Sequence, residues 1–255
     1  MRVKLIQVTQ NPIDVMWTAA RTCYSAKSPV EMWEDRTKKI NENVKDYAQA
    51  TWEAREEQQE KMWNLVKKVS DSGHQSIAEH VYFTFAIEGI SRACSHQLVR
   101  HRAGIVFSQQ SQRYVGFERG NFDFVYPDNV TKNDEIVKKF DKVIKSISQC
   151  YDEMMVTYGI KAEDARSLLP NATKTNITMS VNFRELIHLC NLRLCTRAQK
   201  EIRDLFKEIV KCVKEVDERL ASYLVPQCEV HGVCYEENCC GKKPKLKDIL
   251  KEEIK

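Results

Sequence analysis

Several features that assign a chain to a class at once are missing from this sequence. No apolar run approaches the length of a membrane-spanning helix, no Gly/Ser-rich linker divides the chain, and no internal repeat is visible. The first twelve residues, MRVKLIQVTQNP, alternate like a strand and lack the apolar core of a signal peptide. A G-x-G-x-x-G loop is also absent, which excludes the usual Rossmann mode of dinucleotide binding. We therefore expect a cytoplasmic protein without a membrane partner.

The overall composition is that of a folded chain. Of its 255 residues, 42% are apolar and 30% are charged, which is enough apolar material for a sizeable core. The formal net charge is only +4. A protein that coats nucleic acid usually carries a broad basic surface, so we do not expect a nucleic acid as partner.

Negative charge is missing from one long stretch of the chain. No Asp or Glu occurs between Glu88 and Glu118, yet residues 100–114, RHRAGIVFSQQSQRY, begin with two arginines flanking a histidine. One explanation for Arg100, His101 and Arg102, here called the RHR row, is that the dipole at the C-terminal end of a helix stabilises cations. It does not explain the Ser/Gln run and the arginine that follow. Guanidinium groups beside neutral donors and acceptors suit the phosphate and base of a nucleotide, so this segment predicts a nucleotide site.

The apolar periodicity predicts strands that alternate with helices. We expect strands at residues 2–9, 81–89, 121–127 and 175–183, and helices that begin at Pro12 and Ser91 and cover 35–70, 134–158, 161–170, 183–193 and 197–224. This pattern favours the α+β class, as a single mixed domain with a mostly antiparallel sheet flanked by long helices. We expect a catalytic domain over residues 1–225 and a Cys- and Lys-rich tail over 226–255.

Two further segments contain residues typical of functional sites. SGHQSIAEH places His74, Ser76, Glu79 and His80 on a turn before a strand, where Ser76 and Glu79 also fit simple capping and two histidines are weak support for a metal. The segment VNFRELIHLCNLRLCTRAQ puts Arg184 and His188 on one side of a helix, and further arginines follow. A solvated basic stripe is the alternative, but the leucines around these residues place some cations near a buried surface.

The cysteines fall into two groups. Six are scattered through segments that are predicted to be helical or buried: Cys23, Cys94, Cys150, Cys190, Cys195 and Cys212. The other four lie close together in the tail: Cys228, Cys234, Cys239 and Cys240. The tail could bind zinc through these cysteines and His231, but it lacks the usual C-x2-C spacing. We expect reduced, unliganded thiols and no metal.

The order of the motifs resembles one enzyme family. The chain resembles the flavin-dependent thymidylate synthases, because it contains five motifs in the order typical of that family: GHxSxxEH, QLVRHR, SQQSQRY, ARSLLP and VNFRELIHLCNLRLCTRAQ. The resemblance extends from about residue 10 to about residue 225. One departure is visible, because the family usually has seven residues between R-H-R and its serine, whereas eight separate Arg102 from Ser111 here.

The resemblance implies an activity and a set of ligands. In the family, methylenetetrahydrofolate gives a methylene group to dUMP, reduced FAD gives the hydride that completes dTMP, NADPH reduces the flavin again, and tetrahydrofolate is released. The phosphates of two nucleotides would then supply the negative charge that the chain lacks around the RHR row. The family also implies a homotetramer with sites at subunit interfaces.

The resemblance also implies residue roles. The residues expected to bind FAD are Ser76, Arg100, His101, Arg102, Gln109, Asn182, Phe183, Arg184 and His188. The residues expected to bind dUMP are Gln97, Arg100, Gln109, Gln110, Ser111, Gln112, Arg113, Arg166 and Arg193. Arg193 matches the family residue that polarises the uracil ring. Two other functions use the same features, namely a non-enzymatic nucleotide- or RNA-binding module and a zinc-stabilised structural protein.

Overall fold

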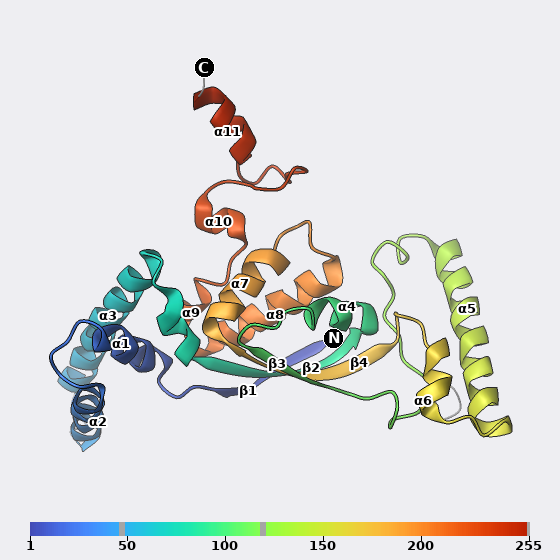
Figure 1. Cartoon of the computed structure of the whole chain (residues 1–255), viewed down its shortest axis with the longest axis horizontal. Coiled ribbons are helices and arrows are strands. Elements are labelled where there is room, and N and C mark those ends of the chain that lie inside the picture. Colours follow the sequence, from blue (N-terminus) through green and yellow to red (C-terminus); the bar gives the residue numbers. More distant parts are fainter. Residues whose placement is uncertain (46–48, 118–120, 254–255) are drawn as a thin grey trace. The chain divides into compact units, whose positions relative to one another are not determined.

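The computed structural model describes residues 1–45, 49–117 and 121–253 (Figure 1). It contains one antiparallel sheet of four strands in the order β1-β2-β4-β3. The strands are β1 (Arg2–Val8), β2 (Tyr82–Ser91), β3 (Ile105–Gln109) and β4 (Lys174–Asn182). The α+β prediction is confirmed, and three of the four strands were predicted.

The longer helices are α1 (Pro12–Thr22), α2 (Pro29–Lys45), α3 (Gln49–Asp71), α5 (Asp134–Asp152), α7 (Phe183–Arg193), α8 (Lys200–Val216) and α11 (Leu246–Glu253). The shorter ones are α4 (Arg92–Leu98), α6 (Ala162–Ala165), α9 (Glu218–Ala221) and α10 (Gln227–His231). Three further turns are helical: Gln75–His80, Glu153–Thr157 and Arg166–Leu168. No helix in the described part of the chain is both long and apolar enough to cross a membrane.

The chain divides into two compact units. The first contains Met1–Ile6, Thr84–Ser180 and Ile187–Lys255, and the second contains Gln7–Phe83 and Val181–Leu186. The tail therefore belongs to the first unit, and the predicted boundary at residue 225 stays a prediction.

The core of the first unit lies between the sheet and three helices. Figure 1 shows α4, α7 and α8 along one face of the sheet. The alternation of β2 buries Phe85 and Ile87, and β4 buries Ile177 and Met179, while α8 buries an apolar stripe. The buried residues of that stripe are Ile202, Leu205, Phe206, Ile209 and Val213.

The second unit is built from α1, α2, α3 and the turn Gln75–His80. A buried ion pair lies inside it, because the guanidinium of Arg36 donates to the carboxylate of Asp14 and both side chains are at most 7% exposed. Gln58 and Gln59 add hydrogen bonds of 3.2 Å to Arg36 and Asp14 respectively. Each member of the pair therefore has a further hydrogen-bond partner, which helps to offset the cost of burying the charges.

The structure corrects several predicted boundaries. The predicted helix over 35–70 is two helices, α2 and α3, and residues 46–48 between them lie outside the described residues. The predicted helix over 197–224 breaks at Asp217, where the backbone is extended (φ −162°, ψ 119°) and the side chain caps α9 through the N–H of Arg219. The predicted strand over 121–127 is reduced to one antiparallel bridge between Phe124 and Thr173.

Candidate active site

The base of the site is the junction between β2 and α4. Ser91 ends β2, and its hydroxyl accepts a hydrogen bond from the N–H of Cys94, which caps α4 as the sequence predicts. The carboxylate of Glu201, at the start of α8, accepts from both the N–H and the hydroxyl of Ser91 at 2.6 Å. These bonds hold the start of α4 against α8, so the residues after α4 leave from a fixed point.

The RHR row follows α4, and its three members do not behave alike. Arg100 and Arg102 are exposed, whereas His101 is half-buried. Neither arginine forms an ion pair with an acid in the described part of the chain. The row therefore offers two unneutralised cations to solvent or to an anionic ligand, as the missing acids in the sequence suggested.

His101 turns toward the end of α7. Its Nε2 lies 2.8 Å from Nη2 and 3.3 Å from Nε of Arg193, and its ring meets the ring of His188 edge-on with 6.4 Å between centroids. Burial, with smaller effects of Arg193 and His188, lowers the pKa of His101 to about 4. The imidazole is therefore neutral at pH 7, and its Nε2 accepts hydrogen bonds from Arg193 while Nδ1 carries the proton.

Arg193 combines a positive charge with a partly apolar environment. Burial lowers the pKa of the Arg193 guanidinium, yet an arginine stays protonated at neutral pH. The nearby thiol of Cys94 is itself buried, and this burial raises its pKa to about 12. No carboxylate pairs with Arg193 among the described residues. Its charge is therefore not cancelled by the protein.

The Ser/Gln run begins on a strand that the sequence analysis missed. β3 ends at Gln109, whose Nε2 donates to Ser95 at 2.8 Å and to Thr175 at 3.2 Å, so this amide group holds β3 in place. Gln110 pairs with Asn176 through both its backbone N–H (2.9 Å) and its side chain (3.0 Å). A surface cavity of about 440 Å³ borders Gln110.

The residues after β3 form a turn. The hydroxyl of Ser111 accepts from the N–H of Arg113 at 3.2 Å, and its carbonyl accepts from the N–H of Val115 at 3.0 Å. The Nε2 of Gln112 is buried and has no hydrogen-bond partner. An unsatisfied buried donor is costly, so this amide marks a place where a polar ligand atom fits.

Two predicted substrate residues meet through a glutamate on α6. The side chain of Glu163 lies 3.3 Å from Nη2 of Arg113, and the carbonyl of Glu163 accepts from Nε of Arg166 at 3.0 Å. The sequence analysis did not select Arg92, the first residue of α4. Burial and the charge of Arg166 lower the pKa of Arg92, so these two arginines lie close enough to repel each other. The sequence offered one indication of Arg92, which is that it directly follows Ser91, the predicted helix cap.

Gln97, on α4, belongs to the same region. Its Nε2 donates to the side chain of Gln199, just before α8, and to the carbonyl of Ala93 at 3.5 Å. Asn191, on α7, has a buried Oδ1 without a hydrogen-bond partner. Gln97 is thus held by the protein, whereas Asn191 offers a polar atom that no described protein group satisfies.

Four predicted cofactor residues belong to the second unit. The Oδ1 of Asn182 accepts from the N–H of Glu185 at 2.8 Å, and the side chain of Phe183 is in the core against Phe83. Arg184 pairs with Glu79, which removes that carboxylate from the possible metal ligands between His74 and His80. Ser76 lines a surface pocket of about 540 Å³ that also touches Val15, Thr18, Thr22 and His80. Only Ser76 and Arg184 in this group present side chains to the surface.

Comparisons with known proteins agree on one family. The model of the family described as thymidylate synthase complementing protein matches residues 4–217. The flavin-dependent thymidylate synthase of Geobacter sulfurreducens is 39% identical over 253 residues, which cover 99% of each chain. The enzyme of the same name from Pyrococcus furiosus is 37% identical over 97% of this chain and 96% of its own.

Solved structures show the same fold. The structure of the flavin-dependent thymidylate synthase ThyX from Helicobacter pylori, complexed with FAD and dUMP, matches 88% of this chain and all of its own with a TM-score of 0.63 and 23% identity. A UMP/dUMP methylase, PolB, from Streptomyces cacaoi, bound with 5-Br dUMP, covers 87% of this chain and 93% of its own, with a TM-score of 0.64 and 18% identity.

Proposed function

Because this chain belongs to the flavin-dependent thymidylate synthases, we propose that it converts dUMP to dTMP by reductive methylation. Methylenetetrahydrofolate is the carbon donor and leaves as tetrahydrofolate, and NADPH is the reductant. FAD, once reduced, supplies the hydride that completes the methyl group. The observation in the structure that carries this proposal is the half-buried Arg193, which is hydrogen bonded to a neutral histidine and not to an acid.

The residues of the first unit fit a ligand with a diphosphate. Arg100 and Arg102 are exposed cations without acidic partners in the described chain, and such guanidinium forks match phosphate oxygens. His101 lies between these two arginines and is fixed by the bond of its Nε2 to Arg193. We assign FAD to these residues together with Gln109 and His188. Gln109 offers only its carbonyl oxygen, since its amide nitrogen already bonds to Ser95 and Thr175.

Four further residues that the proposal assigns to FAD belong to the second unit, namely Ser76, Asn182, Phe183 and Arg184. Ser76 and Arg184 have exposed side chains, and Asn182 keeps its amide NH₂ group after capping α7. The buried side chain of Phe183 is 1% exposed, so it acts by holding the backbone beside Asn182 and Arg184 in place.

The phosphate of dUMP fits the arginines around α6. Arg166 and Arg92 repel each other, and one anion between them would remove this repulsion. Arg113 reaches the same region through Glu163. Gln97, Gln110, Ser111 and Gln112 then provide the neutral donors and acceptors for the sugar and base, with the unpartnered Nε2 of Gln112 as the best available donor.

Arg193 would activate the uracil ring. Carbon 5 of uracil is a poor nucleophile until electron density is pushed into the ring, and a cation against a ring carbonyl stabilises the enolate-like form. A carboxylate partner would cancel the guanidinium charge, whereas the neutral imidazole of His101 orients the guanidinium and leaves its charge intact. This pairing suits a group that must stabilise a developing negative charge.

Ser111 has no partner that would make it a nucleophile. A serine attacks only when a base takes its proton, and the described contact of its hydroxyl is the N–H of Arg113. Ser111 therefore binds the substrate by a hydrogen bond, and polarisation by Arg193 replaces covalent activation.

Copies of this chain are proposed to pack through one face of α5. This helix has an apolar stripe, but Val143 is 58% exposed and Ile136 is 47% exposed. Val143, Ile147 and Leu168 line a shallow apolar hollow of about 390 Å³ together with Lys142, Ser146 and Cys150. The homotetramer implied by the family would cover this face.

A cytoplasmic location, where thiols stay reduced, is part of the same proposal.

The test is made on the purified full-length chain. We expect a yellow protein that releases FAD on denaturation and forms dTMP only when dUMP, methylenetetrahydrofolate and NADPH are all present. A colourless protein that fails to bind FAD in a titration would contradict the proposal. Salt-sensitive binding to long RNA in that colourless protein would favour a binding module instead.

A further inference from the structure

The tail has almost no core of its own. Between Pro226 and Lys251, Cys234 is the only residue of the described tail that is buried, while Val230, Tyr235 and Leu250 are each about half exposed. The segment nevertheless has defined structure, with α10, α11 and a bridge between Cys234 and Lys245. A segment this short with so little apolar burial usually needs a disulfide or a metal to hold it.

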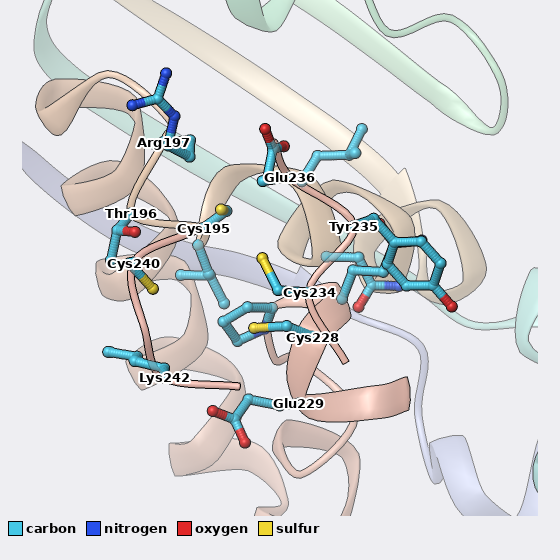
Figure 2. Close-up of a pocket in the computed structure, with 15 residues that line it drawn as sticks. Cys195, Thr196, Arg197, Cys228, Glu229, Cys234, Tyr235, Glu236, Cys240 and Lys242 are labelled. Carbon is cyan, nitrogen blue, oxygen red and sulfur yellow. The ribbon is translucent and has the colours of Figure 1, made fainter. Parts of the chain in front are cut away.

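Cysteines from two distant parts of the chain meet at the base of the tail. Cys195 follows α7, and Cys228, Cys234 and Cys240 come from the tail, yet all four line one cavity with a volume of about 80 Å³. Figure 2 shows their sulfur atoms around this cavity, with Thr196 beside Cys240. The sequence spacing alone did not suggest this set, because Cys195 lies far before Cys228, in the connection between α7 and α8.

The backbone donates hydrogen bonds to three sulfur atoms of the tail, two of which belong to this cluster. The N–H of Gly241 donates to Sγ of Cys239 at 3.3 Å, two residues before it. The N–H groups of Glu236 and Lys242 do the same for Cys234 and Cys240, again two residues before them. Such bonds favour the thiolate, which is the form of cysteine that binds metals.

The thiols also interact with one another. The side chain of Cys228 is within electrostatic reach of Cys195, Cys240 and Cys234, and all four line the same cavity. Four cysteines around one cavity are the donor set of a structural zinc site.

We propose that Cys195, Cys228, Cys234 and Cys240 bind one Zn²⁺ ion in a tetrahedral site. Four thiolates and no open position are typical of a structural zinc site. No three of the sulfur atoms lie within 4.8 Å of one another in the described chain, so the side chains turn inward when they bind the ion. Binding releases the thiol protons to solvent. The expectation of unliganded thiols rested on spacing within the tail and did not include Cys195.

Zinc fits better than an iron–sulfur cluster, which also uses four cysteines. A hydride moves as an electron pair from NADPH to a flavin, so the reaction proposed above needs no one-electron carrier. A single ion is therefore the occupant that we assign.

The site would have a consequence for catalysis. Cys195 comes two residues after Arg193, in the connection between α7 and α8, where Arg203 also donates to the carbonyl of Thr196 at 2.7 Å. Zinc bound by Cys195 would fix the end of α7 and hence the guanidinium of Arg193. Cys195 is in this sense a positioning residue, and it does not touch the substrate.

The test measures metal in the untagged full-length protein, expressed with added zinc and purified under reducing conditions without chelator. We expect one zinc per chain by elemental analysis. Cys228→Ser should lose stoichiometric zinc, because a structural zinc site uses all four of its ligands. Cys23→Ser, at an exposed thiol in the second unit, serves as the control and should keep its zinc. Cys239→Ser tests the choice of ligands and should also keep its zinc, because the Cys239 sulfur bonds to Gly241 and Lys243 although it lies beside Cys234.

A second measurement covers the case in which Cys228→Ser does not fold. Cobalt replacing zinc in the unmodified chain should give strong thiolate-to-cobalt charge-transfer absorption and the visible bands of tetrahedral coordination. A chelator should then expose four additional thiols to a thiol reagent. A protein without stoichiometric zinc and without these cobalt bands would overturn the proposal, as would iron with inorganic sulfide. Zinc lost in Cys239→Ser but kept in Cys240→Ser would overturn the assigned ligands. None of these readouts depends on enzymatic activity.

Discussion

The guanidinium of Arg193 donates to the imidazole Nε2 of His101 across 92 residues of sequence, at 2.8 Å from Nη2. The histidine is neutral, so the bond orients the arginine without cancelling its charge. This relationship gives the first two predictions.

Arg193→Ala is expected to keep bound flavin and lose dUMP-dependent turnover. Removing a preorganised cation should raise the activation free energy by about 2 to 4 kcal/mol. The measurement is kcat at saturating dUMP, with FAD content from the absorption spectrum as the control for folding. Turnover close to that of the parent would remove Arg193 from the chemistry.

The pKa of His101 predicts a dependence of stability on pH. Its folded pKa of about 4 lies below the ordinary value of 6.5, so the unfolded chain binds a proton more readily. The stability associated with neutral His101 is fully present above pH 6.5 and is lost as the pH falls through about 4. His101→Gln should therefore lose less stability than the parent between these pH values.

Denaturant titrations of both proteins at pH 7 and near pH 4 test this, because the acidic residues that they share cancel in the comparison. Equal losses in the two proteins would show that His101 is already protonated at neutral pH or equally exposed when folded.

Ser111→Ala should weaken dUMP binding by about 1 to 2 kcal/mol, as expected for one lost hydrogen bond to a polar ligand group. It should still form dTMP at high dUMP, since its hydroxyl has no base beside it. Binding is measured by titration and turnover by dTMP formation. Complete loss of activity at unchanged dUMP affinity, or a dUMP adduct on Ser111 in a mass spectrum, would show it to be a nucleophile.

Asp14→Ala should lower the free energy of unfolding by about 3 to 5 kcal/mol, because it leaves the buried guanidinium of Arg36 without its anion. Lys61→Ala is the matched control, since it removes an exposed pair with Glu57 and should cost at most about 0.5 kcal/mol. Denaturant unfolding measures both. Similar small losses in the two variants would indicate that Arg36 reaches water when Asp14 is removed.

Val143→Glu should shift the assembly to smaller species, because it places a charge in the apolar hollow of α5. Gln149→Glu makes the same change of charge at an exposed position of this helix outside that hollow and should leave the assembly intact. Light scattering after gel filtration gives the mass of each. A tetramer in both variants would place the interface elsewhere.

The sequence predicted the elements whose apolar pattern is long and regular. β2, β4 and α5 were predicted because their alternation or helical period extends over many residues. β3 was missed because it has five residues between an arginine-rich turn and a glutamine run, and its pairing depends on Asn176, Ser95 and Thr175. Short strands are determined by such distant partners more than by their own sequence.

The candidate site was predicted as a set of residue types, but its pairings were not. The sequence treated Arg100, His101 and Arg102 as one basic row, whereas folding turns the histidine inward and makes it neutral by burial. Arg92 was missed because its neighbour Arg166 is far away in the sequence. Cys195 was likewise separated from the tail cysteines that share its cavity.

The long separations between bonded residues have a consequence for the order of folding. The bonds from Ser91 to Glu201, His101 to Arg193 and Gln109 to Thr175 span 110, 92 and 66 residues. Each closes a large loop, and the entropy of loop closure is lost before the contact stabilises the chain. During synthesis, a nascent chain that has not yet reached Glu201 already contains the RHR row, but the junction of β2 and α4 that precedes this row is not yet held by Glu201. The site is thus assembled late, after most of the chain has left the ribosome.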